Sequence, residues 1–379
     1  MAEYVRLGDV CTVISGSTPK SNIPEYWDGD VIWITPAELN ESSYIIRDSI
    51  RHITTKAVSD TSLRSFPAGT VILSSRAPIG KTAIAGCEMY CNQGFKNLIC
   101  SSRINNKYLY CFLSCKTDYL NSLGRGATFK EISKNIVEDI IIPLPEISKQ
   151  KKIAAKFEHI RNVKQNYERQ RELLDELIKS RFIEQFENKH YQFEKLGTVC
   201  RKITDGTHKT PTYLDEGVTF ISAKNIVNGE LDFVDIKHIS EEEYQEIQKR
   251  CQTDIFDILL SKSGSLGSPV IVKTKEKLGL FESLAVIKYD RDRLLPEFLC
   301  EQLKTDRVQR QFKTGTKGVA IKHLHLGVIA DTDIIVPPLD EQKTFAAFVS
   351  QVDKSKFVVQ KSLQELETLK KSLMQQYFS

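Results

Sequence analysis

Polar, glycine-bearing loops carry most of the residues that could bind an anion. Loops at residues 15–20, 74–81 and 124–130 each place Lys or Arg beside Ser or Thr, and residues 315–322 have the same composition later in the chain. Lys and Arg bind phosphates and guanine, whereas Ser, Thr, Asn and Gln bind other base edges. Any single loop residue is more simply interpreted as part of a solvated turn, but as a set the loops predict contacts with nucleic acid.

Two other motifs resemble catalytic ones without completing them. Residues 75–82 end in Gly-Lys-Thr as a P-loop does, but Ser75 stands where the first Gly belongs. Residues 336–339 (Val-Pro-Pro-Leu) resemble the Pro-Pro core of amino-methyltransferases, but lack the polar residue before it and the aromatic residue after it. We therefore predict no catalytic residue and no cofactor bound by this chain alone.

The nine cysteines are expected to be free thiols in a reducing cytoplasm. Cys87 with Cys91, and Cys111 with Cys115, have a spacing that a metal could use, but buried thiols in an apolar stretch are commonplace. The histidines have no metal-ligand spacing. We predict no metal site.

The charge and hydropathy of the sequence limit the kinds of partner that the chain is expected to bind. The sequence contains no run of 18 apolar residues, which is the length that would predict a membrane-spanning helix. The net charge is +4, and it is balanced locally, with 15 Lys and Arg against 14 Asp and Glu in residues 1–145, and 21 against 22 in residues 190–337. A surface that binds DNA must therefore arise from charges clustered on one face.

Two stretches with a heptad pattern of apolar residues are expected to form the helices that position the loops. In residues 148–188 the apolar seam predicts one long helix, which follows Pro143 and Pro145 and which Ser148 is expected to cap. The pattern recurs from Asp340 onward, and a shift of 192 positions aligns the two stretches without a gap, with a seam lysine at Lys164 and Lys356. Each helix needs a partner for its apolar seam, and we expect the two to pair with each other.

The segments before the helices also repeat one plan. Residues 31–34, 71–73 and 140–142 predict strands, and residues 108–113 and 119–123 predict short helices. Leu7-Gly8 is matched by Leu196-Gly197, and Gly80 by Gly267. The plan is globule, helix, globule, helix. A connection through a whole globule favours antiparallel helices and a pseudo-two-fold relation between the globules.

The sequence thus predicts an α+β protein of two similar mixed domains joined by an antiparallel intramolecular coiled coil. We expect the domains at residues 1–145 and 190–337 and the helices at residues 146–189 and 338–379.

Several motifs resemble those of specificity subunits of type I restriction–modification systems. They are Leu7-Gly8-Asp9-Val10, residues 69–74, and above all Ile142-Pro143-Leu144-Pro145-Glu146 followed by Gln150-Lys151-Lys152-Ile153-Ala154, which residues 335–343 repeat. One departure is residues 147–149, where an acidic residue beside the Gln is more usual.

The resemblance implies two target-recognition domains, each reading half of an asymmetric, interrupted DNA sequence, with the coiled coil setting the spacer. It also implies assembly in the cytoplasm with two methyltransferase subunits, which flip and methylate adenine with S-adenosylmethionine, and with restriction subunits that use ATP and Mg. On this basis we expect DNA contacts from loop side chains in both domains. They are Lys20, Arg76, Lys81, Arg125, Thr128 and Lys130 in the first, and His208, Lys209, Lys224, Lys262, Ser263, Lys317, Lys322 and His323 in the second.

Two other functions remain open at this point. The chain could be a structural coiled-coil adaptor whose globules bind proteins, although an adaptor has no need for two divergent sets of polar loops on one scaffold. A stand-alone methyltransferase or nuclease is disfavoured, since the cofactor and metal motifs are missing.

Replacing Lys317 and Lys322 with Ala is expected to weaken DNA binding and to flatten its dependence on salt. A protein that contacts fewer phosphates releases fewer counterions when it binds. The measurement is DNA binding by the full complex over a range of salt concentrations. Unchanged binding would remove these two lysines from the predicted interface.

Overall fold

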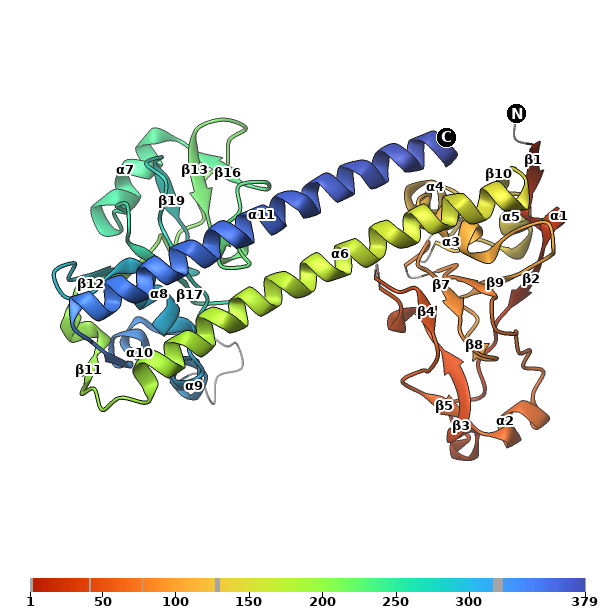
Figure 1. Cartoon of the computed structure of the whole chain (residues 1–379), viewed down its shortest axis with the longest axis horizontal. Coiled ribbons are helices and arrows are strands. Elements are labelled where there is room, and N and C mark those ends of the chain that lie inside the picture. The colour runs from red at the N-terminus through yellow and green to blue at the C-terminus, as the bar shows by residue number, and fades with distance from the viewer. Residues whose placement is uncertain (1–2, 41, 77, 127–129, 316–322, 379) are drawn as a thin grey trace. The chain divides into compact units, whose positions relative to one another are not determined.

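The computed structural model describes residues 3–40, 42–76, 78–126, 130–315 and 323–378 (Figure 1). The chain forms two compact units, which we call unit 1 (residues 1–167 and 361–379) and unit 2 (residues 168–360). Each unit contains one mixed α/β globule and a part of both long helices. The boundaries expected from the sequence for two domains and two helices stay a prediction.

Unit 1 is built on two sheets and a short strand pair. The larger sheet has the order β2 (Cys11–Ser15), β9 (Lys96–Cys100), β6 (Val71–Leu73), β7 (Thr82–Ala85), β4 (Ile45–Ile46), and the smaller has the order β5 (His52–Ile53), β3 (Trp27–Ile34), β8 (Tyr90–Cys91). The strand pair is β1 (Glu3–Arg6) with β10 (Ile141–Leu144). The helices of the globule are α1 (Leu7–Val10), α2 (Thr55–Asp60), α3 (Asn106–Ser114), α4 (Thr117–Ser122) and α5 (Lys134–Glu138).

Unit 2 repeats this arrangement. Its larger sheet has the order β12 (Cys200–Asp205), β20 (Leu284–Tyr289), β17 (Ile258–Ser261), β18 (Pro269–Ile271), and its smaller sheet the order β16 (Lys237–Ile239), β13 (Val218–Ile221), β19 (Leu278–Leu280). The strand pairs are β11 (Phe193–Lys195) with β21 (Asp333–Ile335), and β14 (Ile226–Val227) with β15 (Glu230–Leu231). The helices are α7 (Glu241–Arg250), α8 (Pro296–Lys304), α9 (Asp306–Gly315) and α10 (Leu326–Ala330).

The two long helices are α6 (Ile147–Phe182), extended by a π-helical turn at Ile183–Glu187, and α11 (Leu339–Phe378). Inside unit 1, the start of α6 packs antiparallel on the end of α11, and the Phe157 ring stacks on Phe378 at 5.7 Å. Inside unit 2, the end of α6 packs antiparallel on the start of α11, and the Phe182 ring meets Phe345 at 5.5 Å. These buried rings supply the partner that each amphipathic seam needs.

The seam lysines form the same ion pair in each unit. Lys164 donates to Glu367 at 2.6 Å in unit 1, and Lys356 lies 2.6 Å from Asp175 in unit 2. Both pairs are partly exposed, so each adds little to stability. Their specific geometry favours one register of the helices, as the sequence pattern indicated.

A buried glutamine joins the start of each long helix to its globule. The Gln150 side chain donates to the carbonyls of Arg103 and Pro145, at 3.0 and 2.8 Å, and accepts from the Asn105 N–H at 2.8 Å. Both Gln150 and its counterpart in α11 are fully buried.

The counterpart, Gln342, makes the same three bonds in unit 2. Its side chain donates to the carbonyls of Arg293 and Pro337, at 2.8 and 2.7 Å, and accepts from the Leu295 N–H at 2.9 Å. In each unit one side chain therefore binds the end of a globule loop and the chain just before the helix.

The sequence predicted the fold class, both long helices, their antiparallel pairing and the strands near residues 31–34, 71–73 and 140–142, and these predictions are confirmed. The predicted cap at Ser148 is wrong. The helix begins at Ile147, so Ser148 lies inside its first turn, where the Glu146 carbonyl accepts from the backbone N–H groups of Lys149 and Gln150.

Replacing Gln150 with Ala should open the start of α6, because it removes the partner of two carbonyls and one N–H group in a partly buried contact. We expect a local cost of about 3 kcal/mol, measured by hydrogen exchange as faster exchange at residues 103–106 and 147–153. Gln165→Ala is the matched control, since Gln165 is exposed on the same helix. Equal protection in both variants would contradict the anchoring role.

Candidate nucleic-acid interface

Backbone hydrogen bonds bring the predicted loops of unit 1 together at one corner of the larger sheet. The Ser75 N–H donates to the Gly94 carbonyl at 2.7 Å, which joins the loop at residues 74–81 to the chain just before β9. The Ile132 N–H donates to the Ser75 carbonyl at 3.0 Å, which joins that loop to the segment after residues 124–130. Loops that are far apart in the sequence therefore meet, as an interface requires.

The same backbone bonds recur in unit 2. The Lys262 N–H donates to the Ser283 carbonyl at 2.7 Å, and the Leu324 N–H donates to the Lys262 carbonyl at 2.8 Å. Ser75 and Lys262 therefore occupy one backbone position in two copies of a common framework. The side chains at that position differ completely.

A serine hydroxyl closes the loop after β6 and after β17. Ser74 donates to the Pro78 carbonyl at 2.7 Å and accepts from the Lys81 N–H at 2.8 Å. Ser261 bonds the Ser265 carbonyl and accepts from the Ser268 N–H at 2.9 Å. Each loop then contains a glycine at positive φ, +95° at Gly80 and +79° at Gly267, a conformation that favours glycine.

A second pair of glycines holds the chain after β2 and after β12 against the neighbouring backbone. A Cβ atom at Gly16 would lie 2.0 Å from the Asn92 carbonyl oxygen, and one at Gly206 would lie 2.1 Å from the Leu280 carbonyl oxygen. Only glycine permits this approach. This match was not predicted from the sequence, although both glycines directly follow a strand.

Acidic and basic side chains interlock at this corner in unit 1. The Glu131 carboxylate lies 3.1 Å from the Lys96 ammonium and 4.0 Å from the Arg76 guanidinium. Lys96 also donates to the Ser75 hydroxyl at 3.3 Å, and it is almost fully buried. Arg76 is thereby held at the surface by a partner that leaves some of its donors available.

Unit 2 places a denser cluster at the corresponding corner. The Asp205 carboxylate, 3% exposed, pairs with Lys262, also 3% exposed, and with the more exposed Arg250. Burial disfavours the charged form of Asp205, but hydrogen bonds from Lys262 and Arg250 outweigh it and hold the pKa of Asp205 below its usual value. His208 lies 3.3 Å from Asp205 on the exposed side.

His323 borders this cluster. Burial, and then the positive charge of Lys262, hold the pKa of His323 below its usual value. A neutral imidazole beside Lys262 offers a donor and an acceptor rather than a second positive charge.

The predicted site residues divide by exposure. Five basic side chains lie exposed on the loops or beside them, and these are Lys20, Arg125, Lys130, Lys209 and Lys224. Arg76, Ser263 and His323 are half-buried, and His208 is exposed. Thr128, Lys317 and Lys322 lie outside the described residues.

Two predicted lysines are turned inward instead. The Lys81 ammonium donates to the carbonyls of Pro36 and Leu39, and Lys262 is the buried partner of Asp205. Both support the loops from within in this structure. The sequence reasoning also missed Lys96, Glu131 and Asp205, because nothing in residue type or loop position marks a buried partner.

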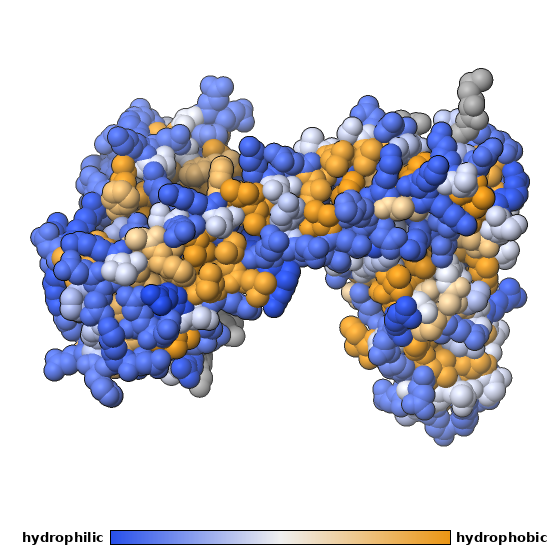
Figure 2. Space-filling view, in the orientation of Figure 1, coloured by the Kyte–Doolittle hydropathy of each residue, from blue (hydrophilic) through white to orange (hydrophobic). Residues whose placement is uncertain are grey.

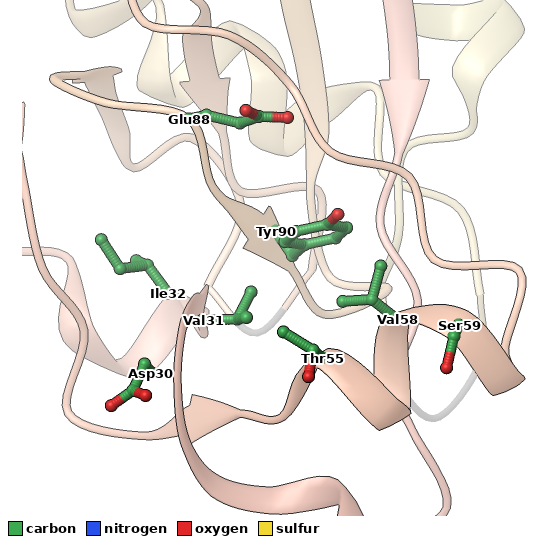
Figure 3. Close-up of a pocket in the computed structure, with 8 residues that line it drawn as sticks. All are labelled: Asp30, Val31, Ile32, Thr55, Val58, Ser59, Glu88 and Tyr90. Atoms are coloured by element: carbon green, nitrogen blue, oxygen red, sulfur yellow. The ribbon is translucent and has the colours of Figure 1, made fainter.

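A pocket of about 420 Å³ lies elsewhere in unit 1 (Figure 3), between β3, α2 and β8. It is lined by Asp30, Val31, Ile32, Thr55, Val58, Ser59, Glu88 and Tyr90. Its charged residues are carboxylates, which repel phosphate. This pocket therefore does not extend the loop surface.

Among the described residues, no group of three or more His, Cys, Asp and Glu side chains is arranged to hold a metal ion, and the cysteines are free thiols. No described helix combines the length and apolar character that crossing a membrane requires.

Comparison with known proteins gives consistent matches over both halves of the chain. A family model described as the type I restriction modification DNA specificity domain matches residues 2–174 and again residues 188–368. The type I restriction enzyme MjaIX specificity subunit of Methanocaldococcus jannaschii is 30% identical over 400 residues, which covers 97% of this chain and 90% of that protein. The type I restriction enzyme EcoBI specificity subunit of Escherichia coli is 22% identical over 313 residues, covering 73% and 65%.

Solved structures share the fold. The S subunit of the type I restriction–modification system of M. genitalium superimposes with a TM-score of 0.53 at 14% identity, covering 100% of this chain and 96% of that one. A chain from a structural study of assembly and conformational transition in the type I R-M system gives a TM-score of 0.59 at 18% identity, covering 99% and 97%.

Replacing Asp205 with Asn should destabilise unit 2 at neutral pH by about 3 kcal/mol, because it leaves Lys262 charged and buried without its anion. The depressed pKa of Asp205 means that the wild type has this stabilisation above about pH 4 and loses it as the pH falls through that pKa. The difference between variant and wild type should therefore shrink in acid.

Hydrogen exchange at β17 and β20 in urea, at pH 7 and below pH 4, measures this difference. Both tryptophans, Trp27 and Trp33, lie in unit 1, so their fluorescence reports that unit and should not change. Asp340→Asn is the control in unit 2, since Asp340 is exposed. An equal difference at both pH values would show that the carboxylate charge is not responsible.

Proposed function

This chain belongs to the family of type I restriction–modification DNA specificity domains, as a specificity subunit that recognises a DNA target, and from this premise we propose that it reads a bipartite, asymmetric sequence. Each unit would read one half of the target. In this family specificity subunits are not themselves catalytic, and we propose that adenine methylation and DNA cleavage are carried out by partner subunits.

One observation carries the bipartite proposal. The two units share backbone hydrogen bonds at the loop corner, but they differ in the partly exposed side chains there. Arg76 follows Ser75 in unit 1, whereas Ser263 follows Lys262 in unit 2. A common framework with different side chains is what two readers of different half-sites require, since base edges are distinguished by side-chain donors and acceptors. A purely structural adaptor would have no use for this divergence.

The exposed loop cations are the proposed phosphate contacts. They are Lys20, Arg125 and Lys130 in unit 1, and Lys209 and Lys224 in unit 2. Phosphate contacts position a protein on the duplex and make its affinity depend on salt. Thr128, Lys317 and Lys322 remain proposed contacts, whereas we propose that Lys81 and Lys262 act by supporting the loops.

We propose that the long helices set the distance between the half-sites and dock the partner subunits. Helix α6 carries residues of both units without interruption, so it is suited to act as a spacer. In unit 2, Phe357 and Val358 are 71% and 62% exposed on α11, and Leu173 and Leu177 are nearly half-exposed on α6. Figure 2 shows hydrophobic patches among the mainly hydrophilic surface residues.

Contiguous exposed apolar patches are typical of protein docking sites. The proposed partners are two methyltransferase subunits, which would bring S-adenosylmethionine, and restriction subunits, which would bring the ATP and Mg sites.

Deleting the gene for this chain should abolish adenine methylation at one interrupted motif in the host, because the methyltransferase subunits would lose their sequence reader. Methylome sequencing before and after deletion measures this, and tagged wild-type chain should co-purify with an adenine methyltransferase. Re-expression of the wild-type chain is the control and should restore the motif. A methylome unchanged by deletion would contradict the proposal.

A further inference from the structure

One pair of contacting polar side chains recurs at the same backbone position in both units. In unit 1 the Thr18 hydroxyl donates to the Gln93 side-chain oxygen. In unit 2 the His208 ring nitrogen Nδ1 lies 3.0 Å from the Glu282 carboxylate. We call these contacts the corner pairs.

Backbone bonds establish that the two corner pairs are equivalent. The Gly16 N–H donates to the Phe95 carbonyl at 3.5 Å, and the Gly206 N–H donates to the Leu284 carbonyl at 3.3 Å. Thr18 and His208 each stand two residues after these glycines, and Gln93 and Glu282 each stand two residues before these carbonyls.

A second match fixes the other side of the corner. The Asn92 N–H donates to the Ile34 carbonyl at 3.0 Å, and the Phe281 N–H donates to the Ile221 carbonyl at 3.0 Å. The residue that follows is Gln93 in one unit and Glu282 in the other. The alignment is therefore structural and needs no sequence similarity.

The corner pairs lie directly beside the predicted DNA loops. Gln93 precedes Gly94, and Glu282 precedes Ser283, whose carbonyls hold the loops at residues 74–81 and 261–268. Thr18, Gln93 and His208 are exposed, and Glu282 is about one-third exposed. Polar side chains held by a rigid framework and open to solvent are suited to read a base edge.

The two corner pairs offer different hydrogen-bond patterns. The Gln93 amide has a donor and an acceptor, the combination that matches adenine N7 and N6 in the major groove. The Glu282 carboxylate, facing an imidazole that also borders Asp205, only accepts, which matches the N4 amino group of cytosine.

We propose that Gln93 and Glu282 are specificity-determining residues, with Gln93 selecting an adenine in one half-site and Glu282 selecting a cytosine in the other. This inference rests on the proposed function, because it assumes that each unit reads one half-site. Thr18 and His208 are positioning residues that orient the two readers.

The proposal is tested by Glu282→Gln in the full chain, expressed in its host in place of the wild type and followed by methylome sequencing. The variant keeps the size of the side chain, removes its charge and replaces one acceptor oxygen with an NH2 donor. We expect the preference for cytosine at one position of one half-site to fall about tenfold, with adenine gaining, while the other half-site is unchanged. Gln93→Glu should cause the reverse change in the other half-site.

The unchanged half-site is an internal control for folding and assembly. Glu246→Gln is the matched control variant, because Glu246 is an exposed carboxylate on α7 of the same unit that pairs with Lys249 on its own helix. If the wild-type host has no interrupted adenine-methylated motif, the proposed function itself is wrong. An intact motif that is fully methylated and unaltered in both corner variants would overturn only the present inference.

If Glu282→Gln abolishes methylation, purified complexes of the chain with its methyltransferase subunits decide the outcome. Their binding is measured on duplexes that vary one base pair of the half-site at a time. Recovery of binding on a single substituted duplex supports the proposal. Equal loss on every duplex overturns it.

Discussion

The fold depends on a buried amide that locks each long helix to its globule. Gln150 and Gln342, both fully buried, each bond two carbonyls and one N–H group of the neighbouring chain. The apolar seam alone would allow a helix to slide or rotate, because hydrophobic contact is not directional. The directional bonds define where each helix starts, and the aromatic packing of Phe378 and Phe186 then follows from the register.

A duplicated framework with divergent contents explains how one chain serves two recognition tasks. The positions that repeat are those that shape the backbone, such as Gly16 and Gly206 at the close approach and Ser74 and Ser261 in the loops. The positions that differ are those that reach solvent or balance charge. Unit 1 uses Lys96 with Glu131, and unit 2 uses Asp205 with Lys262 from different strands and loops.

The sequence predicts those features of the fold that depend on residues close together in the chain, and it does not predict those that depend on contacts between distant segments. The heptad spacing is local and periodic, so it predicts each long helix. A shift of 192 positions aligns the two helical stretches, so it predicts the repeated plan. Whether a loop lysine faces solvent is set by contacts across the fold, and the same residue type gave an exposed Lys209 and a buried Lys262. The matched corner pairs share no sequence pattern, because Thr18 with Gln93 and His208 with Glu282 are related only through backbone bonds.

The glycine approach at Gly16 and Gly206 has an evolutionary consequence. Since the backbone there is held by bonds that do not involve side chains, neighbouring surface residues are free to drift without unfolding the domain. Single substitutions at these surface positions are therefore expected to change target preference without unfolding the domain. A side chain at either glycine would instead meet a neighbouring carbonyl oxygen, so the framework and the reading surface are physically separable.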